Sequence, residues 1–142
     1  MQQMLAARLH GIRDVRTESA PRPQPGPDEV LLAVRAVSLC GSDRHYYVDG
    51  GIGTYDIQSP IILGHEFAAE VTAAGAAGTG LEPGALVAVD PARPCGACEW
   101  CMHGHPNLCP HVRFAGSPPD EQGALAEYFC APRECLFPVP AT

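Results

Sequence analysis

Lysine is absent from this chain, and cations of any kind are scarce. Nine arginines stand against sixteen acidic residues, which gives a formal net charge of −7 at pH 7. Binding to nucleic acid or to an anionic membrane surface draws its affinity from clustered cations. The composition therefore argues against a nucleic-acid partner and against a membrane-surface partner.

Long apolar runs are absent as well. No stretch of the sequence approaches the roughly 18 apolar residues of a membrane-spanning helix. The first residues, MQQMLAARLHG, lack the long apolar stretch of a secretory signal. We therefore expect a cytoplasmic protein with no membrane partner.

What the chain does contain is typical of a small domain rich in turns. Its 142 residues fit one domain, and a hydrophobic content of 46% is ordinary for a folded core. Fifteen glycines and fifteen prolines favour turns and short strands over long helices.

Alternating and β-branched runs predict the strands, and the fold class that follows is mainly β, a small β-barrel with short helices. Segment 17–28 is interpreted as a turn or an extended crossing because its prolines fix φ and remove backbone donors. Residues 50–60 are interpreted as a loop, and the glycine-rich segment 75–80 as a turn rather than a dinucleotide motif. The predicted strands are 4–10, 29–39, 67–73, 86–89, 124–131 and 136–139, with one short helix at 40–49.

Seven cysteines cannot all pair in disulfides, and clustered cysteines in a cytosolic chain more often bind metal. Four of them, Cys95, Cys98, Cys101 and Cys109, follow the pattern C-x2-C-x2-C-x7-C. Four thiolates suit a closed tetrahedral zinc site. The lobe around them, about residues 92–112, has few apolar residues, so the metal would supply much of its order.

Two alternatives stay open for these four cysteines. One is an iron–sulfur cluster, since Cys109 is followed by Pro110 as in the ferredoxin run C-x2-C-x2-C-x3-C-P, although the x7 gap differs. The other is a set of free thiols on a loop, which would be an oxidation liability. His103 and His105 could act as substitute ligands, or be solvated loop residues.

A second set of metal-binding residue types lies earlier in the chain. Cys40 follows the clearest predicted strand, and His65 and Glu66 begin another about 25 residues later. A thiolate, an imidazole and a carboxylate would leave zinc one open position, as in catalytic rather than structural sites. Each of the three alone could equally be a core or a surface residue.

Taken together, the motifs CGSDRHYY at 40–47, GHE at 64–66 and C-G-x-C-x-x-C…N-x-C at 95–109 resemble the zinc-dependent medium-chain alcohol dehydrogenases. The polyol branch, with sorbitol and xylitol dehydrogenases, is the closer match. The resemblance covers essentially the whole chain and implies that residues 1–142 are the N-terminal GroES-like catalytic domain. It also implies one catalytic zinc at Cys40 and His65, with Glu66 as a direct ligand or a nearby group, and one structural zinc at the four cysteines.

The resemblance further implies roles for residues around the catalytic zinc. Ser42 matches the hydroxyl that contacts the substrate alcohol, and His45 matches the surface end of a proton relay. The residues that fall where the polyol branch lines its substrate pocket are Tyr47, Ile52, Tyr55, Phe114 and Ser117.

The second half of that family is a Rossmann domain that binds the nicotinamide cofactor, and these 142 residues contain no counterpart of it. The expected function is the oxidation of a secondary alcohol, such as a polyol, to a ketone with NAD(P), and the full-length form could assemble as a homo-oligomer. We expect the 142-residue chain alone to be inactive. The alternatives are a zinc-binding fragment without catalysis of its own and an iron–sulfur electron-transfer module.

Overall fold

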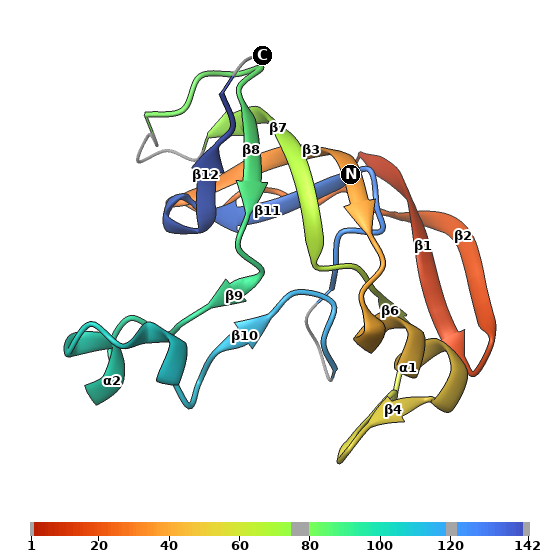
Figure 1. Cartoon of the computed structure of the whole chain (residues 1–142). Coiled ribbons are helices and arrows are strands. Elements are labelled where there is room, and N and C mark those ends of the chain that lie inside the picture. The colour runs from red at the N-terminus through yellow and green to blue at the C-terminus, as the bar shows by residue number, and fades with distance from the viewer. Residues whose placement is uncertain (1, 75–79, 119–121, 141–142) are drawn as a thin grey trace.

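Two antiparallel sheets form most of the fold in the computed structural model, which describes residues 2–74, 80–118 and 122–140 (Figure 1). The three-stranded sheet has the order β2-β1-β6, and the five-stranded sheet has the order β11-β3-β7-β8-β12. The strands of the first sheet are β1 (Gln3–Gly11), β2 (Asp14–Pro21) and β6 (Ile61–Ile62). Those of the second are β3 (Glu29–Ser38), β7 (Glu66–Ala74), β8 (Leu86–Val89), β11 (Tyr128–Pro132) and β12 (Leu136–Pro138).

Residues 124–127 join the two sheets. Ala126 forms an isolated antiparallel bridge with Ala6 of β1, and the Glu127 amide donates to the carbonyl of Leu5. On its other side, the Glu127 carbonyl accepts a hydrogen bond of 2.9 Å from the amide of Val34 in β3. This connection closes the sheets into a curled half-barrel, which confirms the mainly β fold class.

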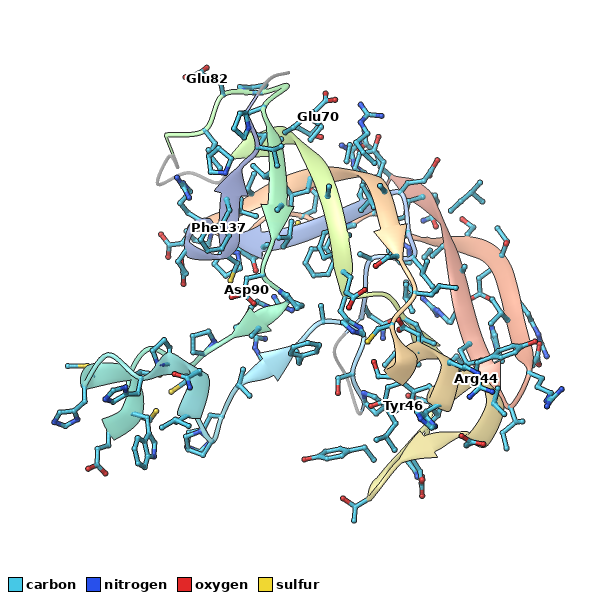
Figure 2. The ribbon with its side chains drawn as sticks, viewed as in Figure 1. Arg44, Tyr46, Glu70, Glu82, Asp90 and Phe137 are labelled. Carbon is cyan, nitrogen blue, oxygen red and sulfur yellow. The ribbon has the colours of Figure 1, made fainter. Side chains whose placement is uncertain are left out.

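The core of the half-barrel is formed by side chains that alternate inward from the five-stranded sheet. Its largest fully buried members are Val30, Leu32, Val71, Val87 and Leu136, each with at most 2% of its surface exposed. A second cluster lies under the helix α1 (Gly41–Asp49), where Tyr46 packs with Leu9, Ile61 and Leu63 (Figure 2). That cluster anchors the helix to the start of the segment that leads into β7.

The cysteine-rich segment extends away from the sheets on a two-stranded ribbon (Figure 1). The ribbon pairs β9 (Ala92–Arg93) with β10 (Arg113–Phe114). Between these strands lie a one-turn helix α2 (Glu99–Met102) and a 3-10 turn η1 (Pro106–Leu108). The remaining short elements are β4 (Gly51–Ile52), β5 (Tyr55–Asp56) and η2 (Arg133–Cys135).

Five of the six predicted strands and the predicted helix are confirmed, and three other predictions need correction. Segment 17–28 is not wholly a crossing, because β2 continues to Pro21; β2 is an edge strand, where proline is tolerated. The strand predicted at 124–131 begins only at Tyr128, since the residues before it bridge the sheets. Residues 50–60 contain the small β4–β5 hairpin. Residues 75–79 lie outside the described part of the chain, so the turn expected there stays a prediction.

No helix in the described ranges is both long and apolar enough to span a bilayer.

Candidate metal centres

The register of two neighbouring strands places the first candidate metal centre. β3 and β7 pair antiparallel, with Ser38 opposite Glu66. Cys40 follows two residues after Ser38 as the N-cap of α1, and His65 directly precedes Glu66. One ligand atom from each of Cys40, His65 and Glu66 therefore lies within 4.8 Å of the others. The structure brings together the three residues that the sequence proposed as one site.

Asp43 is the buried centre of the hydrogen bonding around this cluster. Its carboxylate, 4% exposed, accepts hydrogen bonds from the backbone N–H of Cys40 at 2.9 Å and from that of Gly64 at 3.1 Å. Its Oδ1 also lies 3.7 Å from Nδ1 of His65. One side chain thus ties the start of α1 to the residues that precede β7 and places a carboxylate beside the imidazole. A carboxylate behind a ligating histidine commonly fixes the ring and its tautomer.

The sequence reasoning gave Asp43 no role, although a signal for it was present. An acidic residue three positions after the N-cap of a predicted helix is the pattern of a capping box. The structure shows that box, with Cys40 as the N-cap and Asp43 as its third residue. Capping geometry could therefore have identified Asp43, but not its contact with His65, which is 22 residues away along the chain.

Two glycines allow the chain to pass close to this centre. Gly64 has φ +90°, a conformation that side-chain-bearing residues rarely adopt. A Cβ added to Gly123 would lie 2.3 Å from the carbonyl oxygen of Leu63 and 2.5 Å from that of Gly64. The backbone of Gly123 therefore packs tightly against that of Leu63 and Gly64, the two residues that directly precede His65.

Glu66 differs from the other two candidate ligands because it is exposed. Ser38 Oγ donates a hydrogen bond to its Oε2. This bond holds the pKa of the Glu66 carboxyl below its usual range, with smaller contributions from a hydrogen bond with the Cys40 side chain and from the charge of His65. The carboxylate is therefore the form available to a cation at neutral pH.

The residues that the sequence assigned to proton transfer both lie on α1, but they contact different partners. Ser42 Oγ lies 3.5 Å from Nε2 of His65, beside the candidate ligands. His45 is exposed, and its Nδ1 lies 2.8 Å from Oδ2 of Asp49, one turn further along α1. Within the described residues, His45 pairs with Asp49 and not with Ser42. The roles of Ser42 and His45 stay predictions.

Only two of the five expected substrate residues, Phe114 and Tyr47, lie near the first metal centre. The ring of Phe114 packs against that of His65, with centroids 5.2 Å apart. Tyr47 lines a cleft of about 640 Å³ together with Cys40 and Asp43, beside the apolar Leu39 and Leu63. The other three are placed elsewhere: Ile52 packs against the core beneath α1, Tyr55 is 60% exposed, and Ser117 Oγ donates to the Pro118 carbonyl.

The second candidate centre is formed by the sulfurs of Cys95, Cys98, Cys101 and Cys109, all within 4.8 Å of one another. Backbone N–H groups point at these sulfurs: Cys98 donates to Cys95 and Cys95 donates to Cys109, both at 3.3 Å. His111 likewise donates to Cys109 at 3.4 Å. Such donors stabilise thiolates, so the donor set fits a divalent cation held by four sulfurs.

Two of the four thiols have pKa values that are shifted in opposite directions before any metal binds. Hydrogen bonds from the backbone of Ala97 and Cys98 lower the pKa of Cys95 to about 6. Desolvation, followed by the neighbouring Cys98 thiol, raises the pKa of Cys101 to about 12. The two histidines considered as substitute ligands fall outside this set of four. Nδ1 of His103 instead lies 2.8 Å from the Glu99 carbonyl oxygen.

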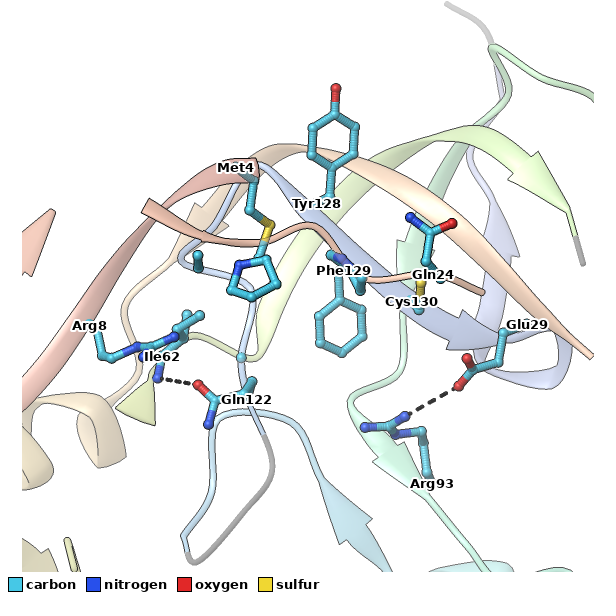
Figure 3. A pocket seen from close by; sticks show the side chains of 14 residues that line it. Met4, Arg8, Gln24, Glu29, Ile62, Arg93, Gln122, Tyr128, Phe129 and Cys130 are labelled. Atoms are coloured by element: carbon cyan, nitrogen blue, oxygen red, sulfur yellow. Dashed lines mark hydrogen bonds and ion pairs between the residues drawn. The ribbon is translucent and has the colours of Figure 1, made fainter. Parts of the chain in front are cut away.

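A further cavity of about 390 Å³ lies between β11 and the three-stranded sheet (Figure 3). It is polar as well as apolar: Arg8 and Arg93 both line it, and the guanidinium of Arg93 lies 5.9 Å from the centroid of the Phe129 ring. Each guanidinium lies close to a glutamate, at 3.3 Å for Arg8 with Glu18 and 3.6 Å for Arg93 with Glu29. Because both arginines already face a glutamate, this cavity is a weaker candidate for a functional site than the two metal centres.

Comparison with known proteins places these features in a family. The profile of the alcohol dehydrogenase GroES-like domain matches residues 26–141. The sorbitol dehydrogenase of Bacillus subtilis is 44% identical over 139 residues, which are 98% of this chain and 39% of that protein.

Two solved structures show the same fold. L-idonate 5-dehydrogenase of Escherichia coli superimposes with a TM-score of 0.90 at 29% identity, covering 99% of this chain and 40% of that one. A cobalt- and zinc-bound thermostable alcohol dehydrogenase of Pyrobaculum aerophilum gives a TM-score of 0.83 at 29% identity, covering 99% of this chain and 43% of that one. The chain spans about two fifths of the length of the relatives that it matches.

Proposed function

The chain belongs to the family of alcohol dehydrogenase GroES-like domains, and from that premise we propose that it is the zinc-binding catalytic domain of an NAD(P)-dependent polyol dehydrogenase. In this proposal residues 1–142 form one GroES-like domain whose structural zinc lobe lies at about 92–112. The nicotinamide cofactor binds in the part of such an enzyme that corresponds to the remaining three fifths of the relatives.

The convergence of Cys40, His65 and Glu66 carries this proposal. A thiolate, an imidazole and a carboxylate make three different donors, and three protein donors leave a tetrahedral zinc one position for another group. The four-sulfur cluster has no such position, and a closed site of that kind is structural. The two donor sets therefore support one catalytic and one structural zinc.

The mechanism assigns each side chain a separate task. Zinc, when bound, supplies the positive charge that makes a nearby hydroxyl easier to deprotonate. Ser42, 3.5 Å from Nε2 of His65, accepts the proton of the substrate hydroxyl and passes a proton outward. His45, whose side chain is exposed, would exchange that proton with solvent.

Two further tasks concern the substrate carbon and its surroundings. Phe114, packed against the His65 ring, excludes water from one side of the site. The nicotinamide cofactor, when held by another part of the enzyme, would supply the acceptor for the hydride of the substrate carbon. The substrate class, the secondary hydroxyl of a polyol, is supported by the relative named for sorbitol.

The experiment joins residues 1–142 to the cofactor-binding part of the Bacillus subtilis sorbitol dehydrogenase and measures sorbitol and xylitol oxidation with NAD⁺ and NADP⁺. We expect turnover by the chimera, none by the 142-residue chain alone, and loss of turnover with loss of one zinc in the Cys40→Ser chimera. Cys130→Ala, which changes a cysteine outside both clusters, is the matched control and should keep both metal content and turnover.

Elemental analysis and absorption spectra of the same samples separate the alternatives. Zinc sites are colourless, whereas an iron–sulfur cluster absorbs visible light and would replace the proposed structural zinc. A chimera that folds and binds two zinc ions but never oxidises a polyol would favour the zinc-binding fragment. Turnover that survives Cys40→Ser would contradict the proposed catalytic centre.

A further inference from the structure

Ser38 is the last residue of β3 and lies directly opposite Glu66, the first residue of β7. Its hydroxyl donates a hydrogen bond to Oε2 of the Glu66 carboxylate. Cys40 follows only two residues later, so one short segment carries both a candidate ligand and the hydroxyl that holds another. Neither the motifs in the sequence nor the mechanism above gives Ser38 a role.

The three candidate ligands are not held equally well. His65 is buried and lies beside Asp43, and the backbone of Cys40 is tied to the same carboxylate. Glu66 is exposed, and a glutamate side chain has several rotatable bonds that it must order before it can bind an ion. The Ser38 hydroxyl is therefore the group that restrains the least constrained ligand.

The hydrogen bond is compatible with coordination by the same carboxylate. A carboxylate has two oxygens and about four lone-pair sites, so it can accept from Ser38 and still face a cation. The structure shows both conditions together, because the Glu66 ligand atom lies within 4.8 Å of those of Cys40 and His65 while the Ser38 bond is made. The bond thus holds the carboxylate beside the centre and not away from it.

We propose that Ser38 is a positioning residue of this metal centre, whose hydroxyl holds the Glu66 carboxylate where it completes the ligand set with Cys40 and His65. The inference rests on the proposed function, since it requires a metal ion at this centre. Loss of a group that orients a ligand typically weakens metal affinity 10- to 100-fold. Since both partners are exposed here, we expect the lower end of that range, about 10-fold.

The test measures Co²⁺ affinity at this centre in the 142-residue chain with zinc retained in the four-cysteine lobe, by following the cobalt absorption spectrum. Ser38→Ala should weaken Co²⁺ binding about 10-fold, and Ser38→Thr, which keeps the hydroxyl, should restore most of the affinity. Ser19→Ala is the matched control, because Ser19 is an exposed strand serine whose hydroxyl donates to a side chain on the neighbouring strand, that of Gln3. Melting temperatures should be the same for all of these variants, which separates positioning from a general loss of stability.

A double-mutant cycle decides whether Ser38 acts through Glu66. In the Glu66→Ala background, Ser38→Ala should have no further effect on Co²⁺ affinity, because the group that it holds is gone. An equal loss in both backgrounds would overturn the inference, as would unchanged or tighter Co²⁺ binding by Ser38→Ala alone. Failure of the unaltered chain to bind Co²⁺ at Cys40 and His65 would refute the proposed function itself, which is a distinguishable result.

Discussion

Replacing Asp43 offers the sharpest test of how the first metal centre is built. Its buried carboxylate accepts hydrogen bonds from the backbone N–H groups of Cys40 and Gly64 and lies 3.7 Å from Nδ1 of His65. Asp43→Asn keeps the shape but replaces one acceptor oxygen by an NH2 group. Asp43→Ala removes both acceptors. The two variants therefore remove the contacts in steps.

The contacts give the size of each step. A hydrogen bond to a charged group contributes about 1.5–3 kcal/mol, and a buried donor left without an acceptor adds its own desolvation cost. Asp43→Asn loses one of the two backbone bonds, so we expect a loss of about 2 kcal/mol in the free energy of unfolding. Asp43→Ala loses both and leaves the buried Gly64 N–H unsatisfied, so we expect about 3–5 kcal/mol.

The same change should appear in metal binding. Without the carboxylate, the His65 ring loses the group that orients it, and we expect zinc affinity at this centre to fall about 10- to 100-fold. Urea unfolding gives the stability, and competition with a chelator gives the affinity. Asp49→Asn is the control, since Asp49 lies on the same helix but its carboxylate is exposed and contacts His45. An Asp43→Asn variant with the stability and zinc affinity of the unaltered chain would refute this account of the site.

The remaining predictions concern the four-cysteine lobe and the backbone contact behind His65. Cys109→Ser should reduce the zinc content from two ions to one by elemental analysis, whereas Cys130→Ala, whose thiol has its pKa raised to about 12 by burial, should leave it at two; equal losses would show that the ligand assignment is wrong. In metal-free protein, Cys95 should be alkylated by iodoacetamide before Cys101, Cys130 and Cys135 at pH 7, because its pKa of about 6 leaves it mainly as thiolate whereas the pKa values of those three are raised. The rate should fall as the pH drops below 6, and mass spectrometry of the labelled peptides should show protection once zinc is added; a Cys95 no faster than Cys130 would contradict the lowered pKa. Gly123→Ala places a Cβ 2.3 Å from the Leu63 carbonyl oxygen, so the backbone must shift. We expect the free energy of unfolding in urea to fall by about 2 kcal/mol and zinc to bind more weakly at the first centre. A variant with unchanged stability and zinc affinity would show that this contact is not tight.

Much of the fold could be predicted because the hydrophobic pattern decides it locally. The run from 29 to 39 is β-branched and partly alternating, and it forms β3, which is paired on both sides in the five-stranded sheet. The hairpin of β1 and β2 was missed for an equally local reason. Its turn contains Arg13 with φ +60°, a left-handed conformation. Glycine or asparagine at that position would have predicted a hairpin turn, whereas arginine does not.

The candidate sites likewise contain features that local sequence predicts and features that depend on the fold. The four cysteines lie within 15 residues, so their spacing alone predicted that their sulfurs would meet. Cys40 and His65 were paired through residue chemistry and resemblance, because nothing local brings residues 25 apart together. The contact of Ser38 with Glu66 and the contacts of Asp43 with Gly64 and His65 could not be predicted, since they depend on the register of β3 with β7 and on the path of the chain at Gly64.

The two metal centres differ in what holds their ligands, and this difference follows from where the ligands lie in the fold. No residue of α2 or η1 is buried, so the lobe has little core of its own, and in our proposal an ion held by the four sulfurs supplies its order. Around Cys40 and His65, a strand register, a buried carboxylate and the cluster beneath α1 fix the ligands without the help of an ion. A catalytic ion needs such an arrangement, because it keeps one coordination position open for substrate. It therefore binds fewer protein ligands and contributes less to ordering the protein. The protein itself must therefore hold the ligands of the first centre, whereas the second centre can be held together by its own metal.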